Sequence, residues 1–578
     1  MAKTIKKRGQ KIIRRLSRAS FKARVESKEH IRENFLQRLS HVKNIRLLVL
    51  EWLLLATVLI MLSVAQAFWF AGSYAENTFI EGGSYIEATI GRVNSMNPLF
   101  ATTPSEKTLS RLMFATLTMY DYSGHPGVGL ANYVRASEDG KVWKIRLRDG
   151  LKWSDGEPIT IDDVLFTIEL IQNPAVSTIY GPNLDNVKVS VNEAGEIVFV
   201  LPSAYADFKA ALEIPIVPKH ELEDAELKAL VEDDFSLNPV TSGAFTFNAR
   251  QATSVTDEEV IYLSANPYYY RGQPMLNSFA IHAYNDKAGV IAAVNNGAVT
   301  ATAELSGIDA NKVLSGSFNR RETRIDAGVF MFMNTTSSAL KNIELRRAIR
   351  QGINLESIRA AAPGTVALDY PLLQSQIKLT DYPAIPATNH DAAAATIAEI
   401  KGDGQITLNI ATVNSGYLPV VAEAIKTELE GLGINAVLTT YEETQEFIAS
   451  TIAQRGYDIL VYEIEMGVDP DLLPYYHSSQ ANKSGLNLSN YRNTMVDDLL
   501  VGARESLDNN LRARKYESFL DYWVADVPAI GLYQANLTYI YNKNVRPYDE
   551  NEILAVGLDR FMDVENWAVA RGTKNLTP

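Results

Sequence analysis

The chain has 578 residues, enough for about three to five domains of ordinary size. Hydrophobic residues make up 46% and charged residues 21%, the balance of a folded protein and not of a disordered tail. Cysteine is absent, which excludes disulfides, thiolate nucleophiles, cysteine zinc sites and iron–sulfur clusters, and none of the seven histidines stands in a local HExxH-type metal motif.

The net charge of −13 divides into two regions of opposite sign. Residues 1–46 contain 15 Lys or Arg and three Glu and carry +12, whereas the rest of the chain carries −25. This asymmetry indicates that the two regions face different environments. Ile31, Phe35, Leu39 and Val42 have the spacing of an amphipathic helix, with a solvated tail as the alternative. Attraction to anionic lipid explains the basic arm without a nucleic-acid partner.

Residues 47–70 form an apolar run, LLVLEWLLLATVLIMLSVAQAFWF, in which Glu51 is the one ionisable residue. As a helix this run is about 36 Å long, enough for a hydrocarbon core of ~30 Å. The positive-inside rule then places residues 1–46 in the cytoplasm and everything after Ala71 outside. A buried soluble helix and a signal peptide cleaved after Ala67 are the alternatives. The long basic leader and the long apolar run favour a retained anchor.

Past a predicted linker at 71–81, strand and helix patterns alternate along the chain. Residues 142–148 alternate in polarity and predict a strand that ends at the turn Asp149-Gly150. Residues 160–163 resemble a capping box, so we expect a helix to begin there and to end at Asn173. Later, 406–410, 419–430 and 434–437 predict a βαβ unit, and 457–463 predicts another buried strand. The predicted fold class is α/β, without solenoid repeats.

The run from Trp143, WKIRLRDGLKWSDGEPITIDDVLFTI, resembles the signature of the extracellular solute-binding proteins of family 5, the oligopeptide-, dipeptide- and nickel-binding receptors of ABC importers. Weaker motifs of the same family follow in the family's order, at Thr241–Phe245, Asn266–Tyr269, Phe332–Asn334, Arg346–Ile349, Asp469–Asp471 and Asn490–Asn493. In the first of these motifs, Ala244 stands where the family usually has proline. The resemblance extends from about residue 82 to about residue 545 and is specific because the motifs recur in order.

The resemblance implies a two-lobed fold of the type II periplasmic-binding-protein class with an inserted subdomain, in which ligand is trapped between the lobes. By analogy, lobe one combines residues 82–118, 214–325 and 530–578, the inserted subdomain spans 119–213, and lobe two spans 326–529. The resemblance also places Ser105 and Glu106 on the segment that runs beside a bound peptide. Lobe two would supply the loop after the strand at 457–463, with Glu465, Met466 and Asp469.

In this loop the sequence departs from the family pattern. Peptide-binding members hold the ligand's amino group with an aspartate a few residues before the acidic-Pro pair that matches Asp469-Pro470, and here Met466 or Gly467 takes that place. Either Glu465 replaces the aspartate, or the ligand has no free amino terminus there and Met466 lines an apolar pocket.

The function that the resemblance implies is a membrane-anchored, extracytoplasmic receptor that captures peptides for the permease subunits of an ABC importer. A ligand sensor not coupled to transport, and the same fold binding a nickel chelate, haem or sugar, are the alternatives. A hydrolase is disfavoured because no G-x-S-x-G motif occurs. We expect no catalytic residues, no cofactor and no metal site, including at His220.

Overall fold

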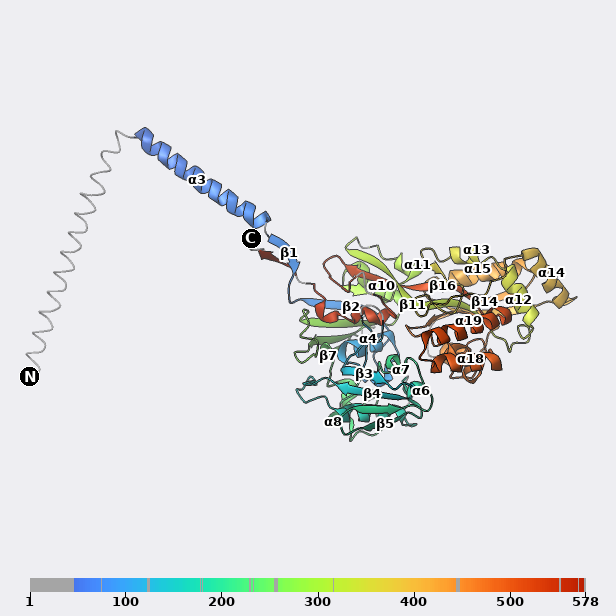
Figure 1. Ribbon diagram of the computed structural model, residues 1–578. Coiled ribbons are helices and arrows are strands. Elements are labelled where there is room, and N and C mark those ends of the chain that lie inside the picture. Colours follow the sequence, from blue (N-terminus) through green and yellow to red (C-terminus); the bar gives the residue numbers. More distant parts are fainter. Residues whose placement is uncertain are drawn as a thin grey trace, which may run out of the picture. The chain divides into compact units, whose positions relative to one another are not determined.

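The computed structural model in Figure 1 describes residues 46–575 except 74, 122–124, 177, 179, 228–229, 232, 254–257, 315, 443–446, 550–552 and 570. The chain forms two compact units. The first comprises Met1–Thr78 and Arg571–Pro578, and the second comprises Phe79–Ala570. The amphipathic helix predicted in the basic arm, residues 31–42, lies outside the described residues.

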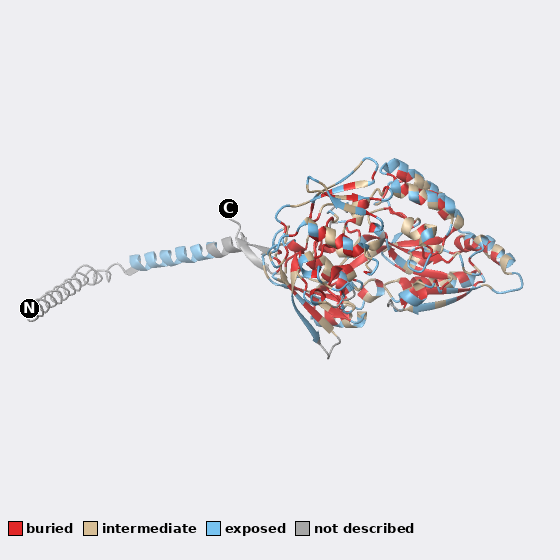
Figure 2. Cartoon of the chain, turned by 90° about the horizontal axis from the view of Figure 1, so that it is seen from below, coloured by how far each residue is buried: buried red, intermediate tan, exposed pale blue. Residues whose placement is uncertain are grey.

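In the first unit, the predicted apolar helix is confirmed as α3, Arg46–Ser73. Among the described residues, its stretch Leu48–Gln66 is the one helical segment that is long and apolar enough to cross a membrane. Its side chains are exposed (pale blue in Figure 2), which argues against a helix buried in a soluble core. The predicted linker contains the end of α3 and strand β1, Ala75–Phe79, which pairs with β17, Arg571–Asn575.

The second unit contains a four-stranded antiparallel sheet. Its strand order is β3 (Ala131–Ala136), β4 (Val142–Leu147), β6 (Ile197–Val200) and β5 (Lys188–Val191). Strand β4 confirms the strand predicted at 142–148. The predicted capped helix is also confirmed as α5, Ile161–Gln172, where the N–H of Thr160 donates to Asp163 Oδ2 at 2.7 Å. Asn173 is the first residue after this helix, as expected.

An eleven-stranded mixed sheet runs through the rest of the second unit, in the order β14-β13-β15-β11-β16-β10-β2-β9-β8-β7, with β12 beside β16. The strands are β2 Ser84–Ile90, β7 Phe245–Thr253, β8 Glu258–Ala265, β9 Ser278–Tyr284, β10 Ala301–Thr302, β11 Phe318–Met333, β12 Val366–Ala367, β13 Thr407–Val413, β14 Asn435–Tyr441, β15 Ile459–Glu465 and β16 Ala529–Asn542. The longer helices are α4 Pro104–Met113, α10 Lys287–Asn296, α12 Ile343–Gly352, α14 His390–Lys401, α15 Leu418–Gly431, α18 Thr494–Glu505 and α19 Asn509–Asp526.

The βαβ unit predicted from the sequence is confirmed at one end of this sheet. Strands β13 and β14 are parallel, and α15 connects them. The strand predicted at 457–463 is β15, which begins and ends two residues later than expected. Gly431 ends α15 and Gly433 adopts a φ of 80°, a conformation that glycine tolerates best.

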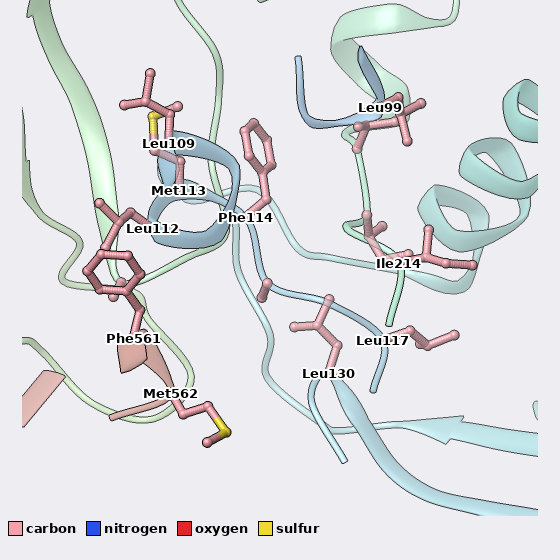
Figure 3. Close-up of a cluster of buried hydrophobic side chains, with 14 of the residues drawn as sticks. Leu99, Leu109, Leu112, Met113, Phe114, Leu117, Leu130, Ile214, Phe561 and Met562 are labelled. Atoms are coloured by element: carbon pink, nitrogen blue, oxygen red, sulfur yellow. The ribbon is translucent and has the colours of Figure 1, made fainter. Parts of the chain in front are cut away.

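Buried hydrophobic side chains gather in two large cores. The first includes Tyr85, Trp153 and Phe279, and the second includes Phe330 and Trp523. Figure 3 shows part of the first core, where side chains of α4 face Phe561 and Met562 from the C-terminal segment. A smaller cluster surrounds Val290 and Leu305 of the α10 region.

Strands β11 and β16 are shared between the two large cores. In β11, residues 325 and 327 belong to the first core and residues 329–333 to the second. In β16, residues 529, 530, 532 and 533 belong to the second core and residues 535, 537 and 539 to the first. These two antiparallel strands therefore join the two cores, and their ladder shifts register between Arg324 and Gly328 and again between Val329 and Phe330, at the junction itself.

Candidate functional site

A cavity with a volume of about 920 Å³ lies where the two cores meet. One wall comes from β11 before the register shift and from the C-terminal segment, including Glu322, Ile553 and Leu554. The opposite wall comes from residues 366–370 and 372–375, together with Tyr382. A ligand in this cavity would contact both cores at once, next to the strands that connect them.

A second cavity of about 350 Å³ shares Glu322 with the first. It lies between Ser306 and Gly307, which follow β10, and the loop 415–418, which follows β13. The two loops touch, because a Cβ placed on Gly416 would lie 2.7 Å from Ser306 Oγ. Nearby, Lys287 Nζ donates to the carbonyl of Asn414 at 2.6 Å, a second link between the two sides.

Asp326 lies on β11 at the register shift and lines the larger cavity. Its Oδ1 accepts a hydrogen bond from Ser375 Oγ at 3.0 Å, and its carbonyl accepts from the N–H groups of Met466 (2.8 Å) and Gly467 (3.0 Å). Burial raises the pKa of Asp326 to about 6, because the charged form loses hydration. The loop after β15, where the sequence predicts site residues, is thus attached to the junction of the two cores.

A group of buried charges holds the other end of this loop. Asp469 pairs with Arg512 of α19, and Arg504 Nε of α18 lies 3.2 Å from Asp471 Oδ2. The guanidinium of Arg504 also lies 4.3 Å from the ring centre of Tyr205, which packs against the first core. Burial raises the pKa of Asp471 to about 6, although Arg504 opposes the shift.

The segment after Tyr205, which follows the last strand of the four-stranded sheet in the chain, also contacts α18. The N–H of Ala206 donates to the carbonyl of Arg504 at 2.8 Å. Asp207 follows, and burial together with the charge of Asp469 raises its pKa to about 7. The contact therefore joins a segment of the first core to two helices of the second, through charges as well as a backbone hydrogen bond.

In the first core, a third arginine pairs with two carboxylates. Arg111 of α4 lies 2.5 Å from Glu213 and 3.0 Å from Asp559. Burial raises the pKa of Glu213 to about 7, and the nearby Arg111 only partly offsets this effect. One guanidinium is not enough to neutralise two buried carboxylates.

Ser105 and Glu106 make their contacts inside the first core. Ser105 is fully buried; its Oγ lies 2.7 Å from Thr89 Oγ1 and 3.2 Å from the carbonyl of Ile90. Glu106 completes the capping box of α4 with Thr103. Burial favours its neutral form, but hydrogen bonds from backbone N–H groups, including that of Thr103, outweigh this effect and lower its pKa. Neither residue occurs among the described residues that line the two cavities.

The other three predicted site residues lie on or after β15. Glu463 and Glu465 are exposed on one face while Ile464 is buried, as strand alternation predicts. The carbonyl of Glu465 accepts a hydrogen bond from the Tyr475 hydroxyl at 2.6 Å. Met466 is buried in the second core, and Asp469 belongs to the charged contact described above. These three residues, like Ser105 and Glu106, are absent from the described lining of the two cavities, although the loop that carries them is attached to Asp326.

Sequence reasoning missed Asp207, Asp326, Arg504 and Arg512. None of them stands in a short motif, and their partners are distant in the chain; Asp469 and Arg512, for example, are 43 residues apart. What distinguishes them is that they are charged and yet buried or half-buried, and local sequence patterns do not reveal burial.

One group of possible metal ligands occurs among the described residues. Asp155, His220 and Glu221 place their ligand atoms within 4.8 Å of one another, and His220 Nε2 lies 2.9 Å from Asp155 Oδ2. All three side chains are exposed, and the short contact is that of a surface ion pair. The group lacks the buried, converging donors that hold a metal firmly.

The family "Bacterial extracellular solute-binding proteins, family 5 Middle" matches residues 126–485. The chain is 23% identical to the "Oligopeptide-binding protein AppA" of Bacillus subtilis over 494 residues, 81% of this chain and 89% of that protein. The structure of AppA from Bacillus subtilis in complex with a nonapeptide matches with a TM-score of 0.71 at 22% identity, over 85% of this chain and all of that one.

NikZ from Campylobacter jejuni in complex with Ni(L-His) matches equally well in fold, with a TM-score of 0.72 at 22% identity over 84% of this chain and 99% of that one. The two-lobed fold expected from the sequence is thereby confirmed. Because the family match covers more than half of the chain, this protein belongs to the bacterial extracellular solute-binding proteins of family 5.

Proposed function

We propose that this protein is a membrane-anchored receptor that captures peptides outside the cytoplasm and delivers them to an ABC importer, by closing two lobes around the ligand. The relative AppA is named as an oligopeptide-binding protein, and its solved structure holds a nonapeptide. The observation that carries the proposal is the cavity of about 920 Å³ at the junction of two cores, beside the two strands that join them. We propose no chemical step on the ligand.

The lobes of this proposal follow the boundaries expected from the sequence. Residues 82–118, 214–325 and 530–578 form lobe one, residues 119–213 form the inserted subdomain, and residues 326–529 form lobe two. The separate four-stranded sheet supports the inserted subdomain, and the passage of β11 from one core to the other near residue 326 supports the first residue of lobe two. Closure about β11 and β16 is then a hinge motion.

Titration with peptides tests the function. A peptide that binds the folded protein is expected to raise the free energy of unfolding by about 2.7 kcal/mol at one hundred times its dissociation constant. Small-angle scattering should show compaction at the same time, because closure brings the lobes together. Native mass spectrometry of the purified protein would identify a ligand that co-purifies. Binding of nickel–histidine but of no peptide would favour the alternative ligand class that NikZ illustrates.

The role of Glu465 is tested in the same titration with an N-acetylated copy of the best peptide. If Glu465 holds the ligand's amino group, acetylation and Glu465→Gln each weaken binding, and together they add little to either change alone. Glu399→Gln is the control, because Glu399 is exposed on α14 and lines neither cavity. If the wild type binds the acetylated and the free peptide equally well, Glu465 does not hold the amino group. The alternative, in which Met466 lines an apolar pocket, would then be favoured.

The membrane anchor makes a separate prediction about topology. We propose that α3 is retained, with residues 1–46 in the cytoplasm and the second unit outside. Protease added to intact cells is then expected to remove the second unit and to leave a protected N-terminal fragment that contains the basic arm. A mature protein that begins at Phe68 would instead show cleavage after Ala67.

A further inference from the structure

The smaller cavity lies at the N-terminal end of α15. Residues 415–418, which end the loop after β13 and begin this helix, form part of its wall. The helix has 14 residues, and its N-cap residue, Tyr417, makes no side-chain hydrogen bond to the first turn. An end of this kind carries partial positive charge and N–H groups without partners in the helix, so it favours a negatively charged group.

Two backbone donors on this wall are left without acceptors. Gly416 has a φ of 52°, whereas Tyr417 has a φ of −93° and a ψ of −5°. Consecutive residues of opposite hand form a nest, in which neighbouring N–H groups turn to one side and can hold an anion. In the described part of the chain, the N–H groups of Gly416 and Tyr417 have no hydrogen-bond partner.

A buried side chain on the same cavity wall is an independent sign of a ligand. Tyr533 of β16 lines the cavity and is 4% exposed, and no described residue hydrogen-bonds to its hydroxyl. Burial, and to a lesser degree the charge of Glu463, raises the pKa of this phenol, so the hydroxyl keeps its proton and can donate. Buried polar groups normally have a partner, and a ligand oxygen would supply the missing one here.

The charged side chains on this wall leave room for an anion. Arg320 Nε lies 2.6 Å from Glu322 Oε1, and Thr538 Oγ1 donates to Glu322 Oε2 at 2.8 Å, so the charge of Glu322 is already balanced. Glu463 is the other charged residue in the described lining, and it is exposed, so water screens its repulsion. The buried donors therefore determine which group the cavity accepts.

We propose that the smaller cavity binds a carboxylate of the captured peptide, through the N–H groups of Gly416 and Tyr417 and the hydroxyl of Tyr533. This inference rests on the proposed peptide-receptor function and adds a site that fixes one group of the ligand. The C-terminus and an acidic side chain both supply a carboxylate. The rest of the peptide exceeds a cavity of about 350 Å³ and would extend past Glu322, which lines both cavities, into the larger one.

The test uses the full chain in lipid nanodiscs and three versions of one pentapeptide. The first has a free C-terminus and no acidic side chain, the second is its C-terminal amide, and the third is the amide with Glu as its last residue. Isothermal titration is expected to show that the free acid binds at least about tenfold more tightly than the amide. Tight binding of the Glu amide would show that an acidic side chain also supplies the carboxylate.

Tyr533→Phe tests the assignment to this cavity. It removes the hydroxyl but keeps the ring, and it is expected to narrow the acid-to-amide affinity ratio several-fold. Tyr262→Phe is the matched control, because Tyr262 is 38% exposed and lines neither cavity. An unchanged ratio in Tyr533→Phe would overturn the assignment, and if this variant does not fold, the comparison of the three peptides on the wild type still decides.

Glu463→Gln distinguishes an anion from a cation in the cavity. Because it removes a negative charge from the wall, it is expected to strengthen binding of the free acid and to widen the acid-to-amide ratio. Weaker binding of both the acid and the amide would mean that a positively charged group occupies the cavity, which overturns the inference.

The outcomes separate this inference from the function on which it rests. Equal binding of the free acid and both amides would overturn the carboxylate site and leave a peptide receptor. Absence of binding by all three peptides would overturn both proposals.

Discussion

Replacing Arg560 with methionine is expected to lower the free energy of unfolding by about 3–5 kcal/mol. Arg560 Nη2 lies 2.8 Å from Glu87 Oε1, and the two side chains are 4% and 0% exposed. The hydroxyl of Tyr85 also donates to Glu87. Without the arginine, the Glu87 carboxylate stays buried and loses the cation that pairs with it among the described residues, which destabilises this part of the first core. Urea-induced unfolding followed by tryptophan fluorescence measures the loss.

Two further variants make this prediction specific to the buried pair. Glu87→Gln combined with Arg560→Met removes both charges and is expected to be more stable than Arg560→Met alone. Lys426→Met is the surface control, because the pair Lys426–Glu423 is 29% and 58% exposed, and its loss is expected to cost less than about 1 kcal/mol. A loss for Arg560→Met as small as that of the control would show that Glu87 tolerates burial without its partner.

Local elements of this fold were predictable because their signals are short. The cap at Thr160 and the alternation in β4 each act within a few residues, and both predictions agree with the structure. Strand pairing over long separations was not predictable in this way. Strand β11 pairs with β16 across some two hundred residues, and β10 and β12 contain two residues each, too few to give a pattern.

The candidate site was predictable only in part, for a similar physical reason. Met466 and Asp469 follow a strand with a clear hydrophobic pattern, so the loop that carries them could be located from the sequence. The sequence Thr103-Pro104-Ser105-Glu106 carries a capping-box signal, and the structure shows that box at the start of α4. The ion pairs of Asp469 and Asp471 depend on arginines from α18 and α19, and they become visible only when the fold brings these segments together.

Locking the loops after β10 and β13 together is expected to prevent ligand exchange. The chain contains no cysteine, so Ser306→Cys with Gly416→Cys introduces a single possible disulfide. A Cβ on Gly416 would lie 3.7 Å from the Cβ of Ser306, within the roughly 3.5–4.5 Å that disulfides require. Gly416 has a φ of 52°, so its replacement costs about 1–2 kcal/mol, which the single variant Gly416→Cys measures.

If the lobes must part to admit ligand, the oxidised double variant is expected to bind peptide on the order of 100-fold more slowly than its reduced form, because the closed state is then the only one populated. Dithiothreitol should restore the rate, and each single variant should be insensitive to oxidant. Stopped-flow fluorescence with a labelled peptide gives both rates on the same sample. Protein oxidised in the presence of peptide should instead retain it through gel filtration, since the same bond then blocks release. Unchanged association after complete oxidation would mean that ligand enters without separation of these two loops, and the hinge at β11 and β16 would no longer account for capture.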